Sequence, residues 1–225
     1  MQELINRAKE LLESGTVARV LGWKAGDFPY NPEPAFFTNA EELKQFVYNG
    51  FCGANLSKYM IEASKLEGKT MICLKPCDTY SFNQLIKEHR VDREKAYIVG
   101  VGCKGKLDIE KAKKLGIKGI ESVAGAEMNG NADILTFQTI YGEKTCAYAD
   151  IMLERCHVCK GKDHMVYDEL IGDSKDTKDA LQRIHLLSSF WKKENFSSGD
   201  IASIFSTSAK RSASLVSFES PISSS

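Results

Sequence analysis

Four of the seven cysteines in this 225-residue chain lie where their thiols could bind a metal. Two of them, Cys156 and Cys159, have two residues between them in the segment LERCHVCKGKDHMVYDELIG, which is basic and contains histidine around the pair, in RCHVCKGK. The other two, Cys77 and Cys103, occur singly in KPCD and GVGCKG. A CxxC pair by itself can form a redox disulfide, bind zinc or hold an iron-sulfur cluster, so the surrounding chain has to distinguish these chemistries.

The elements around the single cysteines predict one shared site. GKTMICLKPC has the pattern of a buried strand that ends at Cys77, and AYIVGVGC has the pattern of a second strand that ends at Cys103. Ligands of α/β proteins collect outside the carboxyl ends of the strands, so a CxxC that returns to this edge would complete a set of four thiolates. Such a set suits tetrahedral zinc or an iron-sulfur cluster. Structural zinc sites usually use two close pairs, so the isolated ligands favour the cluster, and a redox disulfide comes third.

Basic residues and glycines surround the four cysteines. Cations and backbone N–H groups stabilise thiolates and tune the potential of a cluster, and glycine lets the backbone approach sulfur. Lysines also mark solvated loop ends, so they support a thiolate site without establishing one. The residues concerned are Lys75, Lys104, Lys106, Arg155, Lys160 and Lys162, together with Gly100, Gly102, Gly105 and Gly161.

Alternating strand and helix patterns predict an α/β fold with a largely parallel central sheet flanked by helices. Apolar residues recur at helical spacing in several segments, and buried-strand patterns separate them. Three prolines interrupt residues 28–37, which we expect to form an extended loop. The expected helices cover residues 2–14, 38–47, 54–68, 81–90, 108–116 and 176–194, and the expected strands cover residues 16–26, 68–77, 96–103 and 132–156, the last with a turn at Gly142 before a second strand or helix.

Bulk composition excludes several classes of function. Lys plus Arg and Asp plus Glu both number 30, so the chain lacks the net basic charge on which nonspecific nucleic-acid binding relies. No apolar run reaches the roughly 20 residues of a membrane span, and the N-terminus MQELINRAKELLESG is unlike a signal peptide. We therefore expect a cytoplasmic protein without a membrane span and without a nucleic-acid partner. In that reducing compartment the cysteines should not form structural disulfides, and Cys73 and Cys146, inside apolar runs, should pack in the core.

The composition changes near residue 196. Twelve of the 29 residues from 197 to 225 are serine, and the apolar periodicity is lost. Such a segment cannot bury enough apolar surface to offset the entropy of ordering it. We therefore expect residues 1–195 to form one α/β iron-sulfur domain and residues 196–225 to form a disordered Ser-rich tail.

Three segments of the chain resemble the beta subunits of coenzyme F420-reducing hydrogenases and dehydrogenases. ERCHVCKGKDHMVYDELIG resembles that family's CRYC-type segment followed by an acidic, apolar stretch and a glycine. KTMICLKPCDTYSFNQLI resembles its strand that ends in Pro-Cys before a helix, and AYIVGVGCKG resembles its strand that ends in a second lone cysteine. The resemblance, over roughly residues 40 to 175, implies an α/β iron-sulfur flavoprotein fold. It also implies that the ligands of one [4Fe-4S] cluster are Cys77, Cys103, Cys156 and Cys159.

The resemblance further suggests FAD as a second cofactor, but the turn that would hold the flavin departs from the family. Where relatives often have a Ser/Gly-rich turn before a helix, this chain has YNGFCGANLSKYM. The candidate flavin contacts in this turn are Gly50, Cys52, Gly53 and Asn55, and an ordinary helix entry explains the turn equally well. An additional ferredoxin-type cysteine run, frequent in relatives, is missing. The Ser-rich segment begins where that run would stand, as expected of a truncated or frame-shifted gene.

Two hypotheses of different class follow. In the first, the chain is an iron-sulfur electron-transfer subunit of a cytoplasmic oxidoreductase complex and passes electrons through one [4Fe-4S] cluster and a flavin. Its partners would be other redox subunits of hydrogenase, dehydrogenase or heterodisulfide-reductase type, or a ferredoxin-type carrier. No protein general acid or base is needed, because the cofactors supply the chemistry. In the second, the chain is a nonenzymatic α/β assembly or binding module with a structural zinc site made by the four cysteines.

Overall fold

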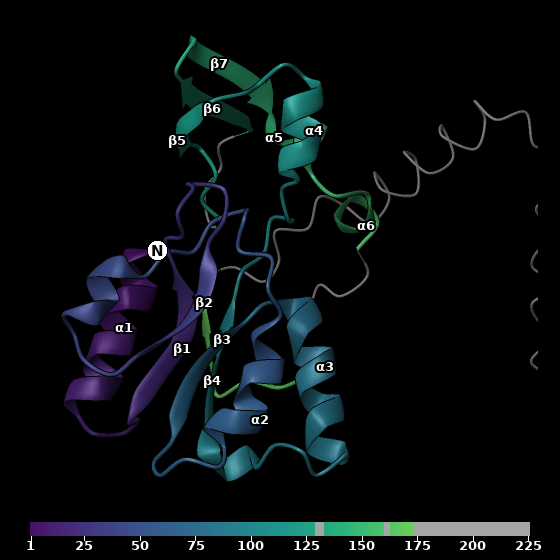
Figure 1. Ribbon diagram of the computed structural model, residues 1–225. Coiled ribbons are helices and arrows are strands. Elements are labelled where there is room, and N and C mark those ends of the chain that lie inside the picture. Colours follow the sequence, from purple (N-terminus) through teal and green to yellow (C-terminus); the bar gives the residue numbers. More distant parts are fainter. Residues whose placement is uncertain (129–132, 160–162, 173–225) are drawn as a thin grey trace, which may run out of the picture. The chain divides into compact units, whose positions relative to one another are not determined.

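The computed structural model describes residues 1–128, 133–159 and 163–172, which all belong to one compact unit of the chain (Figure 1). The helix expected at 176–194, the Ser-rich tail and the boundary at residue 195 lie outside the described residues. Within the described residues, no helix combines the length and the apolar character that a membrane span needs.

A five-stranded sheet with strand order β2-β1-β3-β4-β8 forms the centre of the fold. The pairs β1–β3, β3–β4 and β4–β8 are parallel, and β2 joins β1 as an antiparallel edge strand. The prediction of an α/β fold with a largely parallel central sheet is therefore confirmed. The strands are β1 (Arg19–Lys24), β2 (Glu33–Phe37), β3 (Thr70–Leu74), β4 (Ala96–Val101) and β8 (Glu169–Ile171).

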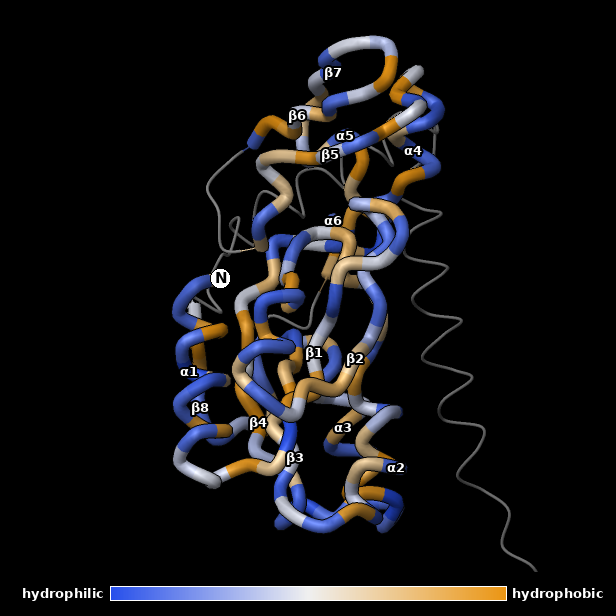
Figure 2. The backbone as a smooth tube through the Cα atoms, turned by 60° about the vertical axis from the view of Figure 1, so that its left-hand side comes forward, coloured by the Kyte–Doolittle hydropathy of each residue, from blue (hydrophilic) through white to orange (hydrophobic). Residues whose placement is uncertain are grey.

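Helices cover both faces of this sheet. Figure 2 shows α1 on one side of the strands and α2 and α3 on the other. Every residue of β3 is buried, as expected of a parallel strand covered on both faces. The helix α3 begins with Pro76 in its first turn, a position where proline leaves no intrahelical hydrogen bond unmade. The helices of this part are α1 (Gln2–Glu13), α2 (Met60–Ala63) and α3 (Pro76–Lys87), with 3-10 helices η1 (Glu42–Gln45), η2 (Leu56–Tyr59) and η3 (Arg93–Lys95).

A second, antiparallel sheet is inserted in the chain between Cys103 and Cys156. Its order is β5-β6-β7, and β6 and β7 form a hairpin whose turn, Ile140 and Tyr141, is followed by Gly142 with a φ of +103°. Its apolar core includes Leu107, Leu135 and Phe137. The elements of this part are α4 (Ile109–Lys114), β5 (Ile120–Ala124), β6 (Ile134–Thr139), β7 (Gly142–Ala147), α5 (Tyr148–Ile151) and α6 (Glu154–His157).

Three expectations about local structure were wrong. Residues 28–37 contain β2 instead of a loop, because Pro34 pairs with Trp23 in the edge strand, where proline costs no interior hydrogen bond. The predicted helix at 38–47 is reduced to η1, although Asn39 Oδ1 accepts the backbone N–H of Glu42 at 2.9 Å where η1 begins. The predicted helix at 54–68 is split into η2 and α2. In both helical segments packing of buried side chains overrides the local propensity.

The short strand β8 is held at the sheet edge by acidic side chains. Asp168 Oδ2 accepts the backbone N–H of Ile98 at 2.7 Å, and Asp168 Oδ1 pairs with Arg93 at 2.6 Å. Glu169 Oε2 accepts hydrogen bonds from Arg7 Nε at 2.8 Å and from the Tyr97 hydroxyl at 3.0 Å. The acidic stretch after the CxxC therefore docks the chain beside β4.

The fold predicts that two aromatic residues of α3 contribute very differently to the free energy of unfolding. Phe82 is 0% exposed, whereas Tyr80 is 47% exposed. Phe82→Ala should lower the free energy of unfolding by about 3–5 kcal/mol, because it leaves a cavity in the core. Tyr80→Ala, the matched control, should change it by less than about 0.5 kcal/mol. Urea unfolding followed by circular dichroism measures both, and equal losses would contradict the packing of α3.

Candidate metal centre

The register of β3 and β4 brings the two single cysteines to the same edge of the sheet. The strands pair Thr70 with Ala96 at one end and Leu74 with Gly100 at the other. Cys77 follows Leu74 by three residues, and Cys103 follows Gly100 by the same three. Neighbouring strands lie about 4.8 Å apart, so both cysteines leave the sheet from adjacent positions.

Cys77 lies in the first turn of α3. The residue is exposed, and its Sγ is 3.8 Å from Asp78 Oδ1. Desolvation by the surrounding protein, followed by the negative charges of Asp78 and Cys103, raises the pKa of Cys77 to about 12. Without a cation the sulfur is therefore a neutral thiol.

Two tyrosines hold the loop that carries Cys103. The Tyr48 hydroxyl donates to the Gly102 carbonyl at 2.6 Å, and the Tyr148 hydroxyl donates to the Gly105 carbonyl at 2.7 Å. Both tyrosines are 2% exposed, and burial raises the pKa of Tyr48 well above its usual value. Because each hydroxyl stays protonated, each remains a donor to the loop.

The CxxC segment packs against the residues that follow Cys103. Gly105 has a φ of +125°, and a Cβ there would lie 2.2 Å from Met152 Sδ, so glycine permits this approach. The backbone N–H of Leu153 donates to the Lys106 carbonyl at 2.8 Å. In return, the Lys106 N–H donates to Cys156 Sγ at 3.4 Å. An N–H group directed at sulfur is a feature of thiolate sites that tunes their electronic properties.

Electrostatic interactions connect the four thiols. Burial raises the pKa of Cys103 to about 11, with smaller upward effects from Cys156 and Cys159, and Cys159 acts in the same direction on the pKa of Cys77. Within the described ranges, no group of three or more Cys, His, Asp or Glu side chains has the arrangement of a preformed metal site. The donor chemistry nevertheless fits a metal, because thiolate sulfur binds iron and zinc, and a bound cation would stabilise the charged form that burial, more than repulsion between the thiols, disfavours.

The remaining cysteines have the character of core residues. Cys52 and Cys73 are both 0% exposed, and burial raises the pKa of Cys52 to about 11 and that of Cys73 to about 12. Cys146 is half-buried beside the core of the second sheet. The expectation that Cys73 packs in the core is confirmed.

The basic residues near the cysteines fall into different environments. Lys75 is buried, with 5% exposure, and is not part of a solvated loop end. The Lys104 ammonium lies 4.6 Å from the Tyr148 ring centroid and 3.6 Å from Asp133 Oδ1. Arg155 is exposed. Lys160, Gly161 and Lys162 lie outside the described residues.

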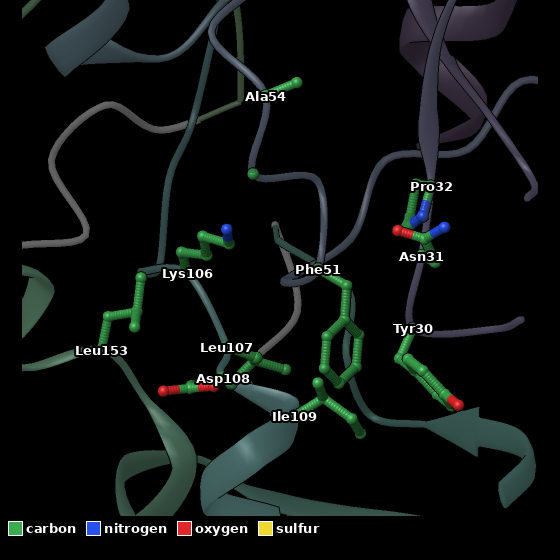
Figure 3. A pocket seen from close by; sticks show the side chains of 11 residues that line it. Tyr30, Asn31, Pro32, Phe51, Ala54, Lys106, Leu107, Asp108, Ile109 and Leu153 are labelled. Atoms are coloured by element: carbon green, nitrogen blue, oxygen red, sulfur yellow. The ribbon is translucent and has the colours of Figure 1, made fainter.

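A pocket of about 360 Å³ opens next to the CxxC segment (Figure 3). In Figure 3 the Lys106 side chain and the Phe51 ring approach it from different sides. Within the described part of the chain, no hydrogen bond or ion pair engages the Lys106 ammonium. The pocket therefore offers an aromatic ring, aliphatic walls and a cation to a ligand. It is lined by Tyr30, Asn31, Pro32, Phe51, Gly53, Ala54, Lys106, Leu107, Asp108, Ile109 and Leu153.

The four candidate flavin contacts occupy different places. Gly53 lines the pocket, and a Cβ there would lie 2.2 Å from Lys106 Nζ. Gly50 uses its N–H and its carbonyl in hydrogen bonds to Ala126 and Leu107. Asn55 Oδ1 caps η2 at 2.9 Å from the N–H of Ser57, which is the ordinary helix entry that the sequence left open. Cys52 is buried in the main core.

Sequence reasoning missed several residues that build the site. Tyr48 and Tyr148, which hold the Cys103 loop, carry no local motif. His164 Nε2 lies 3.1 Å from the Leu74 carbonyl, and its ring fills the space that Gly100 leaves open. His164 thereby docks the chain after the CxxC against the ends of β3 and β4. A histidine five residues after Cys159 was the available signal, but its contact partners lie too far away in sequence to be inferred.

Comparisons with known proteins give partial matches, and no family model matches the chain. The beta subunit of F420-dependent formate dehydrogenase from Methanocaldococcus jannaschii is 28% identical over 107 residues. The beta subunit of F420-dependent formate dehydrogenase 1 from Methanococcus maripaludis is 27% identical over the same length. Each match covers 48% of this chain and 28% of the relative, so the chain corresponds to little more than a quarter of these proteins.

A solved structure shares the fold. A chain of the F420-reducing [NiFe] hydrogenase complex from Methanosarcina barkeri superposes with a TM-score of 0.52 at 16% identity, over 72% of this chain and 63% of that chain. The resemblance predicted from the sequence is confirmed as a partial similarity: over 107 residues the chain is similar to beta subunits of F420-dependent formate dehydrogenases, and it shares its fold with a chain of the F420-reducing hydrogenase complex.

Proposed function

We propose that this chain is an iron-sulfur electron-transfer subunit of an oxidoreductase complex. Its [4Fe-4S] cluster would be held by Cys77, Cys103, Cys156 and Cys159. The observation that carries the proposal is the β3–β4 register, which places Cys77 and Cys103 after adjacent strand ends. The CxxC segment is hydrogen-bonded to the loop that follows Cys103. The relation to beta subunits of F420-dependent enzymes supports the same function.

The chain's own groups would hold and tune such a cluster. A bound [4Fe-4S] cluster supplies one-electron transfer. The four thiolates bind the iron, the Lys106 N–H stabilises charge on Cys156, and the two tyrosines fix the Cys103 loop. The surrounding protein sets the potential through burial, hydrogen bonds and nearby charges.

A flavin is the second cofactor of the proposal, and the pocket beside Lys106 is its candidate site. The volume of about 360 Å³ lies in the range of small-molecule sites, enough for the ring system of FAD and not for the whole molecule. Phe51 and Tyr30 offer aromatic surface, and the Lys106 ammonium offers a charge to an anionic group of the ligand. Because the pocket adjoins the CxxC segment, electrons could pass between flavin and cluster over a short distance.

The proposed role in electron transfer also suggests which proteins the chain binds and in which cellular compartment it works. An electron-transfer subunit needs a donor and an acceptor, so we propose that the chain assembles with other redox subunits of hydrogenase, dehydrogenase or heterodisulfide-reductase type, or exchanges electrons with a ferredoxin-type carrier. We place this complex in the cytoplasm, where reduced thiols are available for cluster assembly.

Metal analysis of the anaerobically purified chain tests the cluster. The wild-type protein should contain iron and acid-labile sulfide in equal amounts. Serine substitution at any of the four ligand positions should remove most of both, because serine lacks the thiolate. Cys146→Ser is the matched control and should retain the wild-type iron content. A colourless protein with one zinc per chain would instead favour the module with a structural zinc site.

Flavin binding tests the pocket. Lys106→Met removes the ammonium but keeps the backbone N–H that reaches Cys156. It should weaken FAD binding on the order of tenfold, the effect of one lost hydrogen bond to a charged group. Lys118→Met, which changes an exposed lysine outside the pocket, should bind FAD as the wild type does. Fluorescence titration measures both, and equal affinities for the two variants would rule out a flavin beside Lys106.

A further inference from the structure

Lys75 is a buried cation between the pocket and the candidate metal ligands. It is 5% exposed and lies directly after β3, two residues before Cys77. Lysine is almost never fully buried unless it is paired, because desolvating an ammonium is costly. Its surroundings therefore have to supply compensating contacts.

Four contacts compensate the charge of Lys75. Its Nζ lies 2.9 Å from Asp78 Oδ2 and donates to the carbonyls of Cys52 and Ala54, each at 3.2 Å. The ammonium also lies 4.5 Å from the ring centroid of Trp23. Together these contacts hold the ammonium in one place.

These contacts connect two functional regions. Ala54 lines the pocket, and the carbonyls bonded to Lys75 flank Gly53, which lines it as well. On the other side, Asp78 Oδ1 lies 3.8 Å from Cys77 Sγ. A continuous path of close contacts thus runs from the pocket wall through Lys75 and Asp78 to the first ligand cysteine.

The charges of Lys75 and Asp78 have opposite electrostatic effects on the candidate ligand thiols. The Asp78 carboxylate places a negative charge 3.8 Å from Cys77 Sγ. The Lys75 ammonium, 2.9 Å from the other oxygen of the same carboxylate, places a positive charge directly behind it. A positive charge that stabilises thiolate also stabilises the more negative, reduced state of a cluster bound to it.

We propose that Lys75 and Asp78 are positioning residues that set the reduction potential of the cluster and tie it to the wall of the pocket. This inference rests on the proposed function. Removing the ammonium should make reduction of the cluster less favourable, and removing the carboxylate should make it more favourable. Structural damage alone would not produce shifts of opposite sign.

The test is a redox titration of the anaerobically purified full chain, followed by electron paramagnetic resonance. Lys75→Gln keeps a donor for the two carbonyls but removes the charge, and it should disfavour cluster reduction about tenfold, which is about 59 mV for one electron. Asp78→Asn should shift the potential in the opposite direction by a similar amount. Lys58→Met is the matched control, since its ammonium also lies over a ring, 4.9 Å from the centroid of Tyr59, but is exposed. Its potential should equal that of the wild type.

The outcomes separate this inference from the function on which it rests. A wild-type chain without iron and sulfide overturns the proposed function itself. A wild-type chain with a cluster, but with unchanged potentials or shifts of the same sign in Lys75→Gln and Asp78→Asn, overturns the role of the pair. If one variant does not retain the cluster, the sign of the potential shift in the other variant decides whether the proposed role of Lys75 and Asp78 holds.

Discussion

The parallel register of β3 and β4 is the constraint on which the candidate site depends. It pairs Leu74 with Gly100, so that equal steps along the chain lead to Cys77 and Cys103. A slip of one residue would move one cysteine relative to the other and reverse the direction of the strand's side chains. The register is well specified because β3 is buried at every position and both strands contribute to the main core. The hydrophobic core therefore fixes the positions at which Cys77 and Cys103 follow the two strands.

The second half of the site depends on bringing a distant segment back to that edge. The inserted sheet separates Cys103 from Cys156 in sequence, yet Leu107 and Met152 form a bridge that closes this insertion at its base. After the CxxC, His164 and β8 attach the chain to the ends and the edge of the main sheet. The CxxC thus lies between a contact with Leu107, shortly after Cys103, and contacts with the end of β3 and the edge of β4.

The sequence predicted the parts of this structure that local pattern determines. Apolar runs of the right length identified β3 and β4, and single cysteines after two such runs indicated a common edge. Pro34 misled the interpretation of β2, because proline is compatible with an edge strand and the position of a strand in its sheet is not a local property. The burial of Lys75 and the roles of Tyr48 and Tyr148 depend on partners more than 40 residues away or on several partners at once. Such contacts do not produce a periodic residue pattern that a single sequence could show.

Whether two single cysteines and a CxxC pair bind one cluster can be tested by an anomalous diffraction map of the anaerobically crystallised chain at the iron edge. One cubane-sized peak should lie within bonding distance of the sulfurs of Cys77, Cys103, Cys156 and Cys159. Iron bound by the CxxC pair alone, with either single cysteine remote from it, would contradict a single four-cysteine site.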